Sequence, residues 1–135
     1  MEITFIEIKE FRQTMLVKRG EGFDFLREMV GMDWEKEGLG AIYILENSIT
    51  REGVELAVRT TDREKPQIPT VSDIWHIAEL YEREVFDFYG IEFTGHPDMR
   101  RLYLRNDWVG YPLRKDYDPS EATNPVRLES ETKEE

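Results

Sequence analysis

The chain contains no cysteine, so it can form no disulfide, ligate no iron–sulfur cluster through thiolates and use no thiol nucleophile. It also lacks an excess of positive charge. The net charge of -11 argues against binding to nucleic acid or, independently of other proteins, to anionic lipid. No apolar run is long enough to span a bilayer, and the first residues show no signal-peptide pattern. We therefore expect a soluble intracellular protein.

Motifs for metal and nucleotide sites are missing as well. The two histidines, His76 and His96, have no HExxH or paired-carboxylate spacing, which disfavours a metal site. His96 stands between Gly95 and Pro97, a rigid turn that favours hydrogen bonding. Neither a GxGxxG nor a P-loop pattern occurs. Side-chain amides are scarce beside Glu, Lys and Arg, a balance that resembles hyperthermophile composition.

The chain does contain enough apolar residues for one domain. Of its 135 residues, 39% are hydrophobic, which suits a single core. Apolar runs predict strands at residues 3–8 and 15–17, and helical spacing predicts a helix over residues 23–30. Two further runs, residues 41–45 and 54–58, predict a β-hairpin.

The clearest predicted element is a helix from Ser72 to Tyr89. Thr70 and Asp73 have the spacing of a capping box before it, and Gly90 suits its C-terminal cap. A stripe of apolar residues at helical periodicity should lie against the sheet; it consists of Ile74, Ile77, Ala78, Tyr81, Val85 and Phe88. These elements predict an α+β fold, a small two-layer domain in which a mixed or antiparallel sheet packs against helices.

Glycine and proline interrupt the chain too often after Phe93 for regular structure, apart from a short strand predicted at residues 102–104. We therefore divide the chain into a compact domain (residues 1–93), an extended arm (residues 94–118) and a tail (residues 119–135). The tail is acidic and lacks aromatic residues, so we expect it to be flexible.

Charged side chains on the predicted helix have two interpretations. Glu79, Arg83 and Asp87 follow each other at four-residue intervals, which predicts a ladder of ion pairs on the exposed side. Acid–base catalysis by Glu82, Glu84 and Asp87 is the alternative. Helical geometry spreads these carboxylates around the helix, whereas catalysis needs them to converge on one substrate.

The arm combines cations with aromatic side chains. Its basic residues are Arg100, Arg101, Arg105, Arg114 and Lys115, interleaved with Tyr103, Trp108, Tyr111 and Tyr117. Arginine and aromatic residues dominate protein interfaces, so this pattern suits an arm that lies on a partner protein. It suits equally well a loop that wraps over its own domain, and an arm can pack at its base while its tip reaches outward.

Residues 68–118 resemble the 30 kDa subunit family of respiratory complex I, whose bacterial members are of the NuoC type. The signature positions are Glu82, Arg83, Glu84, Asp87, Phe88, Tyr89, His96, Arg100, Leu102 and Tyr103. The stretch GIEFTGHPDMRR, the block around Trp108 and Gly110 that continues into PLRKDY, and the upstream VSDIW extend the match. The N-terminal half agrees with the family only in layout.

Two departures from the family pattern refine this resemblance. Family members commonly carry histidine where this chain has Tyr111, and this chain is shorter at its N-terminus than typical respiratory members. Short versions with a thermophile-like composition are more similar to archaeal energy-converting complexes, such as membrane-bound nickel–iron hydrogenases.

The resemblance implies a non-catalytic, peripheral subunit on the cytoplasmic side of the cell membrane, with no cofactor or metal of its own. Its implied partners are the large catalytic subunit, of 49 kDa or nickel–iron type, and a neighbouring iron–sulfur subunit; other subunits would make the membrane contact. An archaeal hydrogenase is the first expectation, and an NADH or F420H2:quinone oxidoreductase the second. The expected interface residues are Arg83, Glu84, Asp87, His96, Arg100, Arg101, Trp108, Arg114, Lys115, Asp116 and Tyr117.

Two alternatives from other classes stay open. One is a free-standing acid–base enzyme that uses Glu82, Glu84 or His96, and it predicts turnover by the isolated chain. The other is a soluble adaptor outside any membrane complex, which predicts that the protein fractionates without an integral-membrane partner.

Overall fold

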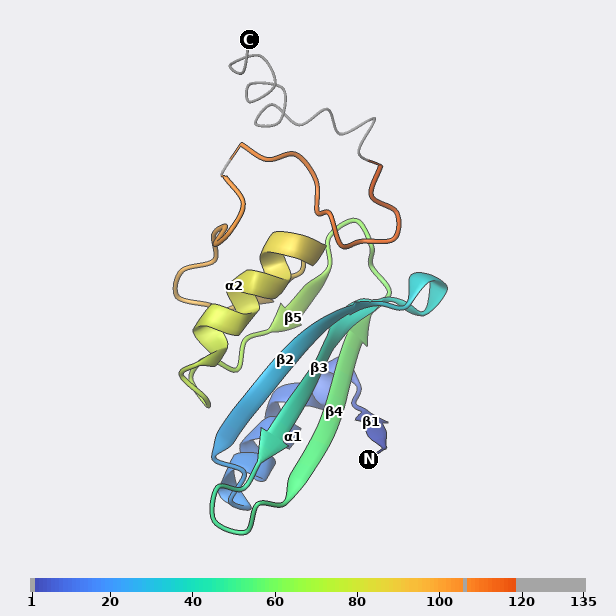
Figure 1. Cartoon of the computed structure of the whole chain (residues 1–135). Helices are drawn as coiled ribbons and strands as arrows, with labels where there is room; N and C mark the ends of the chain where they lie inside the picture. The colour runs from blue at the N-terminus through green and yellow to red at the C-terminus, as the bar shows by residue number, and fades with distance from the viewer. Residues whose placement is uncertain (1, 106, 119–135) are drawn as a thin grey trace.

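The computed structural model describes residues 2–105 and 107–118 (Figure 1), so the predicted tail, residues 119–135, lies outside the described residues. The strands are β1 (Ile3–Phe5), β2 (Phe25–Asp33), β3 (Leu39–Glu46), β4 (Gly53–Thr60), β5 (Gln67–Pro69) and β6 (Glu92–Thr94). The helices are α1 (Ile8–Gly20) and α2 (Ala78–Tyr89), and a 3-10 turn, η1 (Glu35–Glu37), follows β2. The predicted α+β class is confirmed.

The main sheet has the strand order β1-β4-β3-β2. The predicted hairpin is confirmed, because β3 and β4 are consecutive and antiparallel. The side-chain oxygen of Asn47 accepts hydrogen bonds from the N–H groups of Ile49 and Thr50 and so closes the hairpin turn. β1 joins the other side of β4 in parallel. A second, two-stranded parallel sheet pairs β5 with β6, the strands on either side of α2 in the chain.

The strand predicted at residues 15–17 is wrong, because these residues belong to α1. Phe11 and Met15, four residues apart, are buried, while Leu16 and Val17 are exposed. This is the spacing of a helix that buries one narrow face. The strand predicted over residues 3–8 is also shorter than expected, since β1 ends at Phe5.

The helix predicted over residues 23–30 is wrong as well, because most of this segment lies in β2. The register shifts between Leu26 and Glu28, which marks a β-bulge. The extra residue lets Leu26 and Met29, three positions apart, both enter the core, where each is less than 5% exposed. The bulged strand therefore imitates helical spacing in the sequence.

The helix before the arm begins later than predicted, at Ala78 instead of Ser72, and residues 72–77 form turns. The predicted capping box does not form, because the Asp73 carboxylate receives both guanidinium nitrogens of Arg12. Within the predicted apolar stripe, Ala78 and Val85 are buried but Ile77 is exposed. The predicted C-terminal cap is confirmed: Gly90 ends α2 in a left-handed conformation with φ of 76°.

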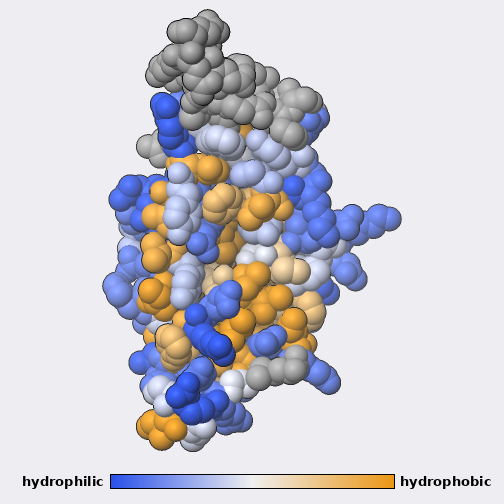
Figure 2. All heavy atoms as spheres, viewed as in Figure 1, coloured by the Kyte–Doolittle hydropathy of each residue, from blue (hydrophilic) through white to orange (hydrophobic). Residues whose placement is uncertain are grey.

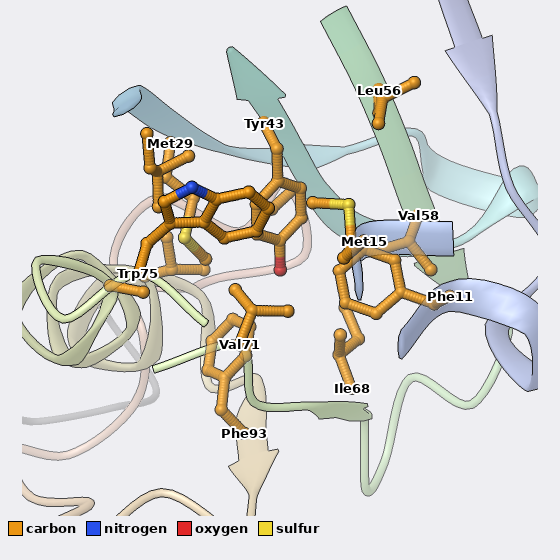
Figure 3. Close-up of a cluster of buried hydrophobic side chains, with 14 of the residues drawn as sticks. Phe11, Met15, Met29, Tyr43, Leu56, Val58, Ile68, Val71, Trp75 and Phe93 are labelled. Atoms are coloured by element: carbon orange, nitrogen blue, oxygen red, sulfur yellow. The ribbon is translucent and has the colours of Figure 1, made fainter. Parts of the chain in front are cut away.

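The core lies between one face of the main sheet and the two helices. Figure 3 shows Met29, Tyr43 and Val58 of the sheet beside Phe11 and Met15 of α1. Side chains that flank α2 in the chain complete it, namely Ile68, Val71, Trp75 and Phe93. In the described part of the chain, no helix has the length and apolar character needed to cross a membrane.

Candidate partner-binding arm

The arm starts at the last residue of β6, Thr94, and His96 joins its first turn to α2. The His96 side chain is fully buried. Its Nδ1 accepts the N–H of Asp98 at 2.9 Å, so the ring proton lies on Nε2, which is 2.9 Å from the Glu79 carbonyl oxygen. The imidazole therefore joins the arm to the helix by hydrogen bonds, the role that its rigid turn suggested.

Asp87 sets the path of the next part of the arm. Its side chain is fully buried, and its Oδ2 accepts the backbone N–H groups of Leu102, Tyr103 and Leu104 at 3.1, 2.6 and 3.0 Å. Three consecutive N–H groups that converge on one oxygen cannot alternate sides as in a strand. The strand predicted at residues 102–104 is therefore wrong, and a turn around a carboxylate takes its place.

Arg101 connects this turn to the remainder of the arm. Its guanidinium donates to Asp87 Oδ1 at 3.1 Å and to the Asp87 carbonyl oxygen at 2.7 Å. The second nitrogen donates to the carbonyl oxygens of Trp108 and Gly110, and the guanidinium carbon lies 4.7 Å from the centre of the Tyr111 ring. Burial alone would raise the pKa of Asp87, but the bonds from Leu104, Tyr103, Arg101 and Leu102 outweigh it and lower the pKa below its usual value.

The ion-pair ladder predicted on the exposed side of the helix is wrong, because neither of its two pairs forms. Asp87 is inside the protein, and Arg83 donates to the carbonyl oxygens of Arg100 and Arg101 at 3.2 and 2.8 Å. Glu84 contacts the arm too, because the Tyr103 hydroxyl donates to its carboxylate at 3.2 Å. The charged side of α2 is thus the surface on which the arm lies.

A second buried carboxylate, Asp33 at the end of β2, holds the other end of the arm. Sequence analysis missed it, since an aspartate shortly after a predicted helix indicates no more than a turn. Both oxygens of Asp33 receive the guanidinium of Arg63, at 2.9 and 2.8 Å, and Oδ2 also accepts the Lys115 N–H at 2.8 Å. These bonds, together with one from the Glu35 N–H, outweigh the effect of burial and lower the pKa of Asp33.

The arm's last residues extend this contact. Arg114 donates to the Arg63 carbonyl oxygen at 2.8 Å and forms two bonds with Asp116 at 2.9 Å each. Asp116 also lies 3.3 Å from Arg63. Arg63 and Arg114 alternate with the carboxylates of Asp33 and Asp116, which closes the network between the arm and the loop after β4.

Glu82 is a third buried carboxylate, and it lies on the same side of α2 as the buried Ala78 and Val85. It is fully buried, and it accepts bonds from the Thr70 hydroxyl at 2.5 Å and the Val71 N–H at 2.8 Å. Burial is the main effect and raises the pKa of Glu82 to about 7. Its four-residue spacing from Ala78 was the signal that it points inward. The carboxylate holds the segment before α2 against the helix.

Several apolar side chains of the arm remain exposed. Tyr103 is 61% exposed and Leu113 is 54% exposed, and Val109 is exposed as well. Arg100 and Lys115 also extend into solvent, with 65% and 59% of their side chains exposed. The arm therefore has an inner side that bonds to the domain and an outer side that mixes apolar and cationic groups.

The predicted interface residues divide between these two sides. Asp87, His96, Arg101 and Arg114 are largely occupied within the chain, and Arg83 and Glu84 contact the arm. Arg100, Lys115 and Asp116 are exposed, whereas Trp108 and Tyr117 are half-buried. Their role at a partner surface stays a prediction. Among residues 2–105 and 107–118, no three His, Asp or Glu side chains are arranged to hold a metal ion.

Comparison with known proteins places this arrangement in a family. The model of the respiratory-chain NADH dehydrogenase 30 kDa subunit family matches residues 3–123. The chain belongs to this family. The C/D subunit of the NADH-quinone oxidoreductase of Phocaeicola vulgatus is 58% identical over 127 residues, which are 93% of this chain and 24% of that protein. The chain spans about a quarter of the length of the first curated relatives that it matches.

Two solved structures have a similar fold. The trypsin-resistant fragment of Nqo5 superimposes with a TM-score of 0.66 at 30% identity, and covers 71% of this chain and 80% of the fragment. A chain of the membrane-bound sulfane sulfur reductase, an archaeal respiratory membrane complex, reaches a TM-score of 0.77 at 28% identity. That match covers 97% of this chain and 76% of the archaeal one. Members of the family to which this chain belongs are subunits of an oxidoreductase complex.

Proposed function

We propose that this chain is a non-catalytic peripheral subunit of a complex I-type electron-transfer complex, and that its arm docks on the large catalytic subunit. One observation carries the proposal. Two buried carboxylates, Asp87 and Asp33, fix an arm that has no regular secondary structure, while Tyr103 and Leu113 remain exposed on it. An arm held in one shape before binding loses little conformational entropy when it meets a partner.

The large subunit is the proposed partner because of how the relatives are built. The names of the Phocaeicola and Bacteroides relatives join the letters C and D, and this chain matches about a quarter of their length. Because these names join subunits C and D in one polypeptide, we infer that a subunit of the D type is a neighbour of this chain. We extend the proposal to a neighbouring iron–sulfur subunit, to a position on the cytoplasmic side of the membrane, and to membrane contact only through other subunits.

A quinone-linked complex is the version that the relatives favour, because the similarity to NADH-quinone oxidoreductase subunits reaches 58% identity. An archaeal complex has a separate argument in its favour. The sulfane sulfur reductase chain covers nearly the whole of this one and has the higher TM-score of the two structures compared. The hydrogenase expected first from the sequence stays a prediction.

Burial of the candidate acid–base groups supports a non-catalytic role. The side chains of Glu82 and His96 are both fully buried, so a substrate has no direct access to either. Glu84 is accessible, and it accepts a hydrogen bond from the Tyr103 hydroxyl. No hydrogen bond among the described residues joins Glu84 to a second acidic side chain. A free-standing enzyme therefore lacks a converging pair of groups at an open site.

Co-expression with the D-type subunit from the same source tests the docking. Leu113→Glu places a charge at the centre of the arm's outer side and should weaken co-purification about 30-fold, the effect of losing a hot spot of about 2 kcal/mol. Ile49→Glu is the matched control, because Ile49 is 88% exposed in the β3–β4 turn, far from the arm (Figure 1). A folded Leu113→Glu variant that co-purifies at the wild-type yield would show that the arm is not the docking site.

A further inference from the structure

The second face of the main sheet is largely apolar, although no helix of the described residues covers it (Figure 1). Direct pairing places Val30, Ile42, Ala57 and Phe5 side by side on this face, across all four strands. The neighbouring rows of paired residues place Met32 and Ile44 on the same face. We call these six residues the outer face. Figure 2 shows hydrophobic areas on the front of the molecule, with hydrophilic side chains between them. An uncovered face of an antiparallel sheet usually carries polar side chains, so the pattern indicates contact with another surface.

One end of the outer face carries a cluster with the composition of an interface hot spot. The Arg59 guanidinium lies 4.1 Å from the centre of the Phe5 ring and 5.5 Å from that of Trp34. The two rings meet edge to face, with their centres 5.3 Å apart. Phe5 is 46% exposed despite these contacts. Tryptophan and arginine are the residues most enriched among hot spots, and they work best when a partner excludes water from them.

Arg59 has no carboxylate partner among the described residues, since its contacts are with these two aromatic rings. A guanidinium stacked by its face keeps its N–H groups free at the edge, where they can bond to a carboxylate or a carbonyl oxygen. The opposite end of the face carries Glu28 and Glu55, which flank Ile44 in the sheet register. The complementary surface is therefore apolar, with an acceptor opposite Arg59 and a cation opposite the two glutamates.

The outer face is continuous with the outer side of the arm. A groove between β2 and α2 is lined by Val30 on the sheet side and by Glu84, Phe88 and Leu113 on the other. Val30 belongs to the outer face and Leu113 to the exposed part of the arm. A partner seated on Leu113 thus meets the outer face with no intervening element. A second copy of this chain is disfavoured as the occupant, because two chains of net charge -11 repel each other.

We propose that the large subunit that docks on the arm continues across β2 onto the outer face, where Phe5, Trp34 and Arg59 form its second group of strong contacts. This inference rests on the proposed function, because it takes the partner of the arm as given. It assigns to that partner an acidic or carbonyl group opposite Arg59 within an apolar surface.

Site-specific photo-crosslinking in the assembled complex tests the inference. A photoreactive residue at position 59 and another at position 113 should both crosslink to the D-type subunit, identified by mass spectrometry. A crosslink from position 113 alone, or from position 59 to a different subunit or to a second copy of this chain, overturns the inference and leaves the proposed function intact. If neither position crosslinks to the D-type subunit, the proposed function itself fails.

Two charge-reversal variants give an independent readout. Arg59→Glu should weaken binding to the D-type subunit about 30-fold, whereas Lys9→Glu should leave it unchanged, because Lys9 lies on α1 behind the opposite face of the sheet. Trp34→Ala should reproduce the effect of Arg59→Glu without adding a charge. Unchanged binding by folded Arg59→Glu and Trp34→Ala variants, with equal thermal midpoints, overturns the inference.

Discussion

The carboxylate of Asp87 and the guanidinium of Arg101 lie 3.1 Å apart, and each also holds backbone groups of the arm. The Asp87 carboxylate accepts hydrogen bonds from N–H groups before Arg105 in the chain. The Arg101 guanidinium donates to carbonyl oxygens after Arg105. The pair therefore replaces the hydrogen-bond ladder that a strand would supply. This explains how a segment rich in glycine and proline keeps a defined path over α2.

Asp87→Asn should loosen the arm. The asparagine side chain removes the negative charge opposite Arg101. Its N–H₂ group would also face the N–H groups that now donate to Asp87. We therefore expect the free energy of unfolding to fall by about 3–5 kcal/mol. Hydrogen exchange at Leu102–Leu104 should quicken in the native state. Asp98→Asn is the control, since Asp98 is half exposed and pairs only with the exposed Arg100. Equal exchange rates in the two variants would contradict the role of Asp87.

Glu82→Gln should change the pH dependence of stability. Burial raises the pKa of Glu82 to about 7 in the folded protein, from an ordinary value of 4.5. Folding therefore favours the protonated form, and the free energy of unfolding should fall as pH rises from about 4.5 to about 7. Over that window, the shift corresponds to about 3 kcal/mol.

Glutamine mimics the protonated acid, so the Glu82→Gln variant should lose this slope and be the more stable protein at pH 8. Chemical denaturation of both proteins at several pH values measures the difference. The two proteins differ at this one side chain, so the difference between their curves reports on the charge of Glu82. Parallel curves would show that Glu82 does not titrate in this range.

Arg63→Lys keeps the positive charge beside Asp33 but removes the forked geometry. One ammonium cannot make both bonds to the Asp33 carboxylate and also reach the Glu35 carbonyl oxygen and Asp116. We expect a loss of about 1–3 kcal/mol in thermal or denaturant unfolding. Arg51→Lys is the control, because Arg51 makes a single exposed pair with Glu46 in the hairpin.

Gly90→Ala should be destabilising by about 1 kcal/mol or more. Gly90 has φ of 76°, and an added Cβ would lie 2.6 Å from the Tyr111 ring of the arm. Gly20→Ala, at the end of α1, meets nothing within 4 Å and should be neutral or stabilising. Thermal midpoints that shift equally in the two variants would contradict this explanation.

The sequence predicted those elements whose local pattern has one meaning. The hairpin of β3 and β4 follows from two apolar runs around a short polar turn, and Gly90 marks the end of α2 because few other residues accept its conformation. The errors come from patterns with two meanings. The bulge beside Arg27 gives β2 the spacing of a helix, and the apolar residues 15–17 of α1 resemble a strand because two of them are exposed.

The candidate site was harder to predict, because its residues are joined by long-range contacts. The predicted interface set contains Asp87, His96 and Arg101, but residue types alone do not show whether a charge points inward. Asp33 lies far from the signature in sequence and reaches the arm only through the fold. The outer-face cluster likewise combines residues from β1, β4 and the turn after β2, so no local motif reveals it.

The bond between Asp33 and the Lys115 amide spans 82 positions. During synthesis on a ribosome, the sheet and both helices can form before this last closure, which needs nearly the entire described chain to have emerged. The arm would thus take its final path over the domain only after the sheet and both helices have folded.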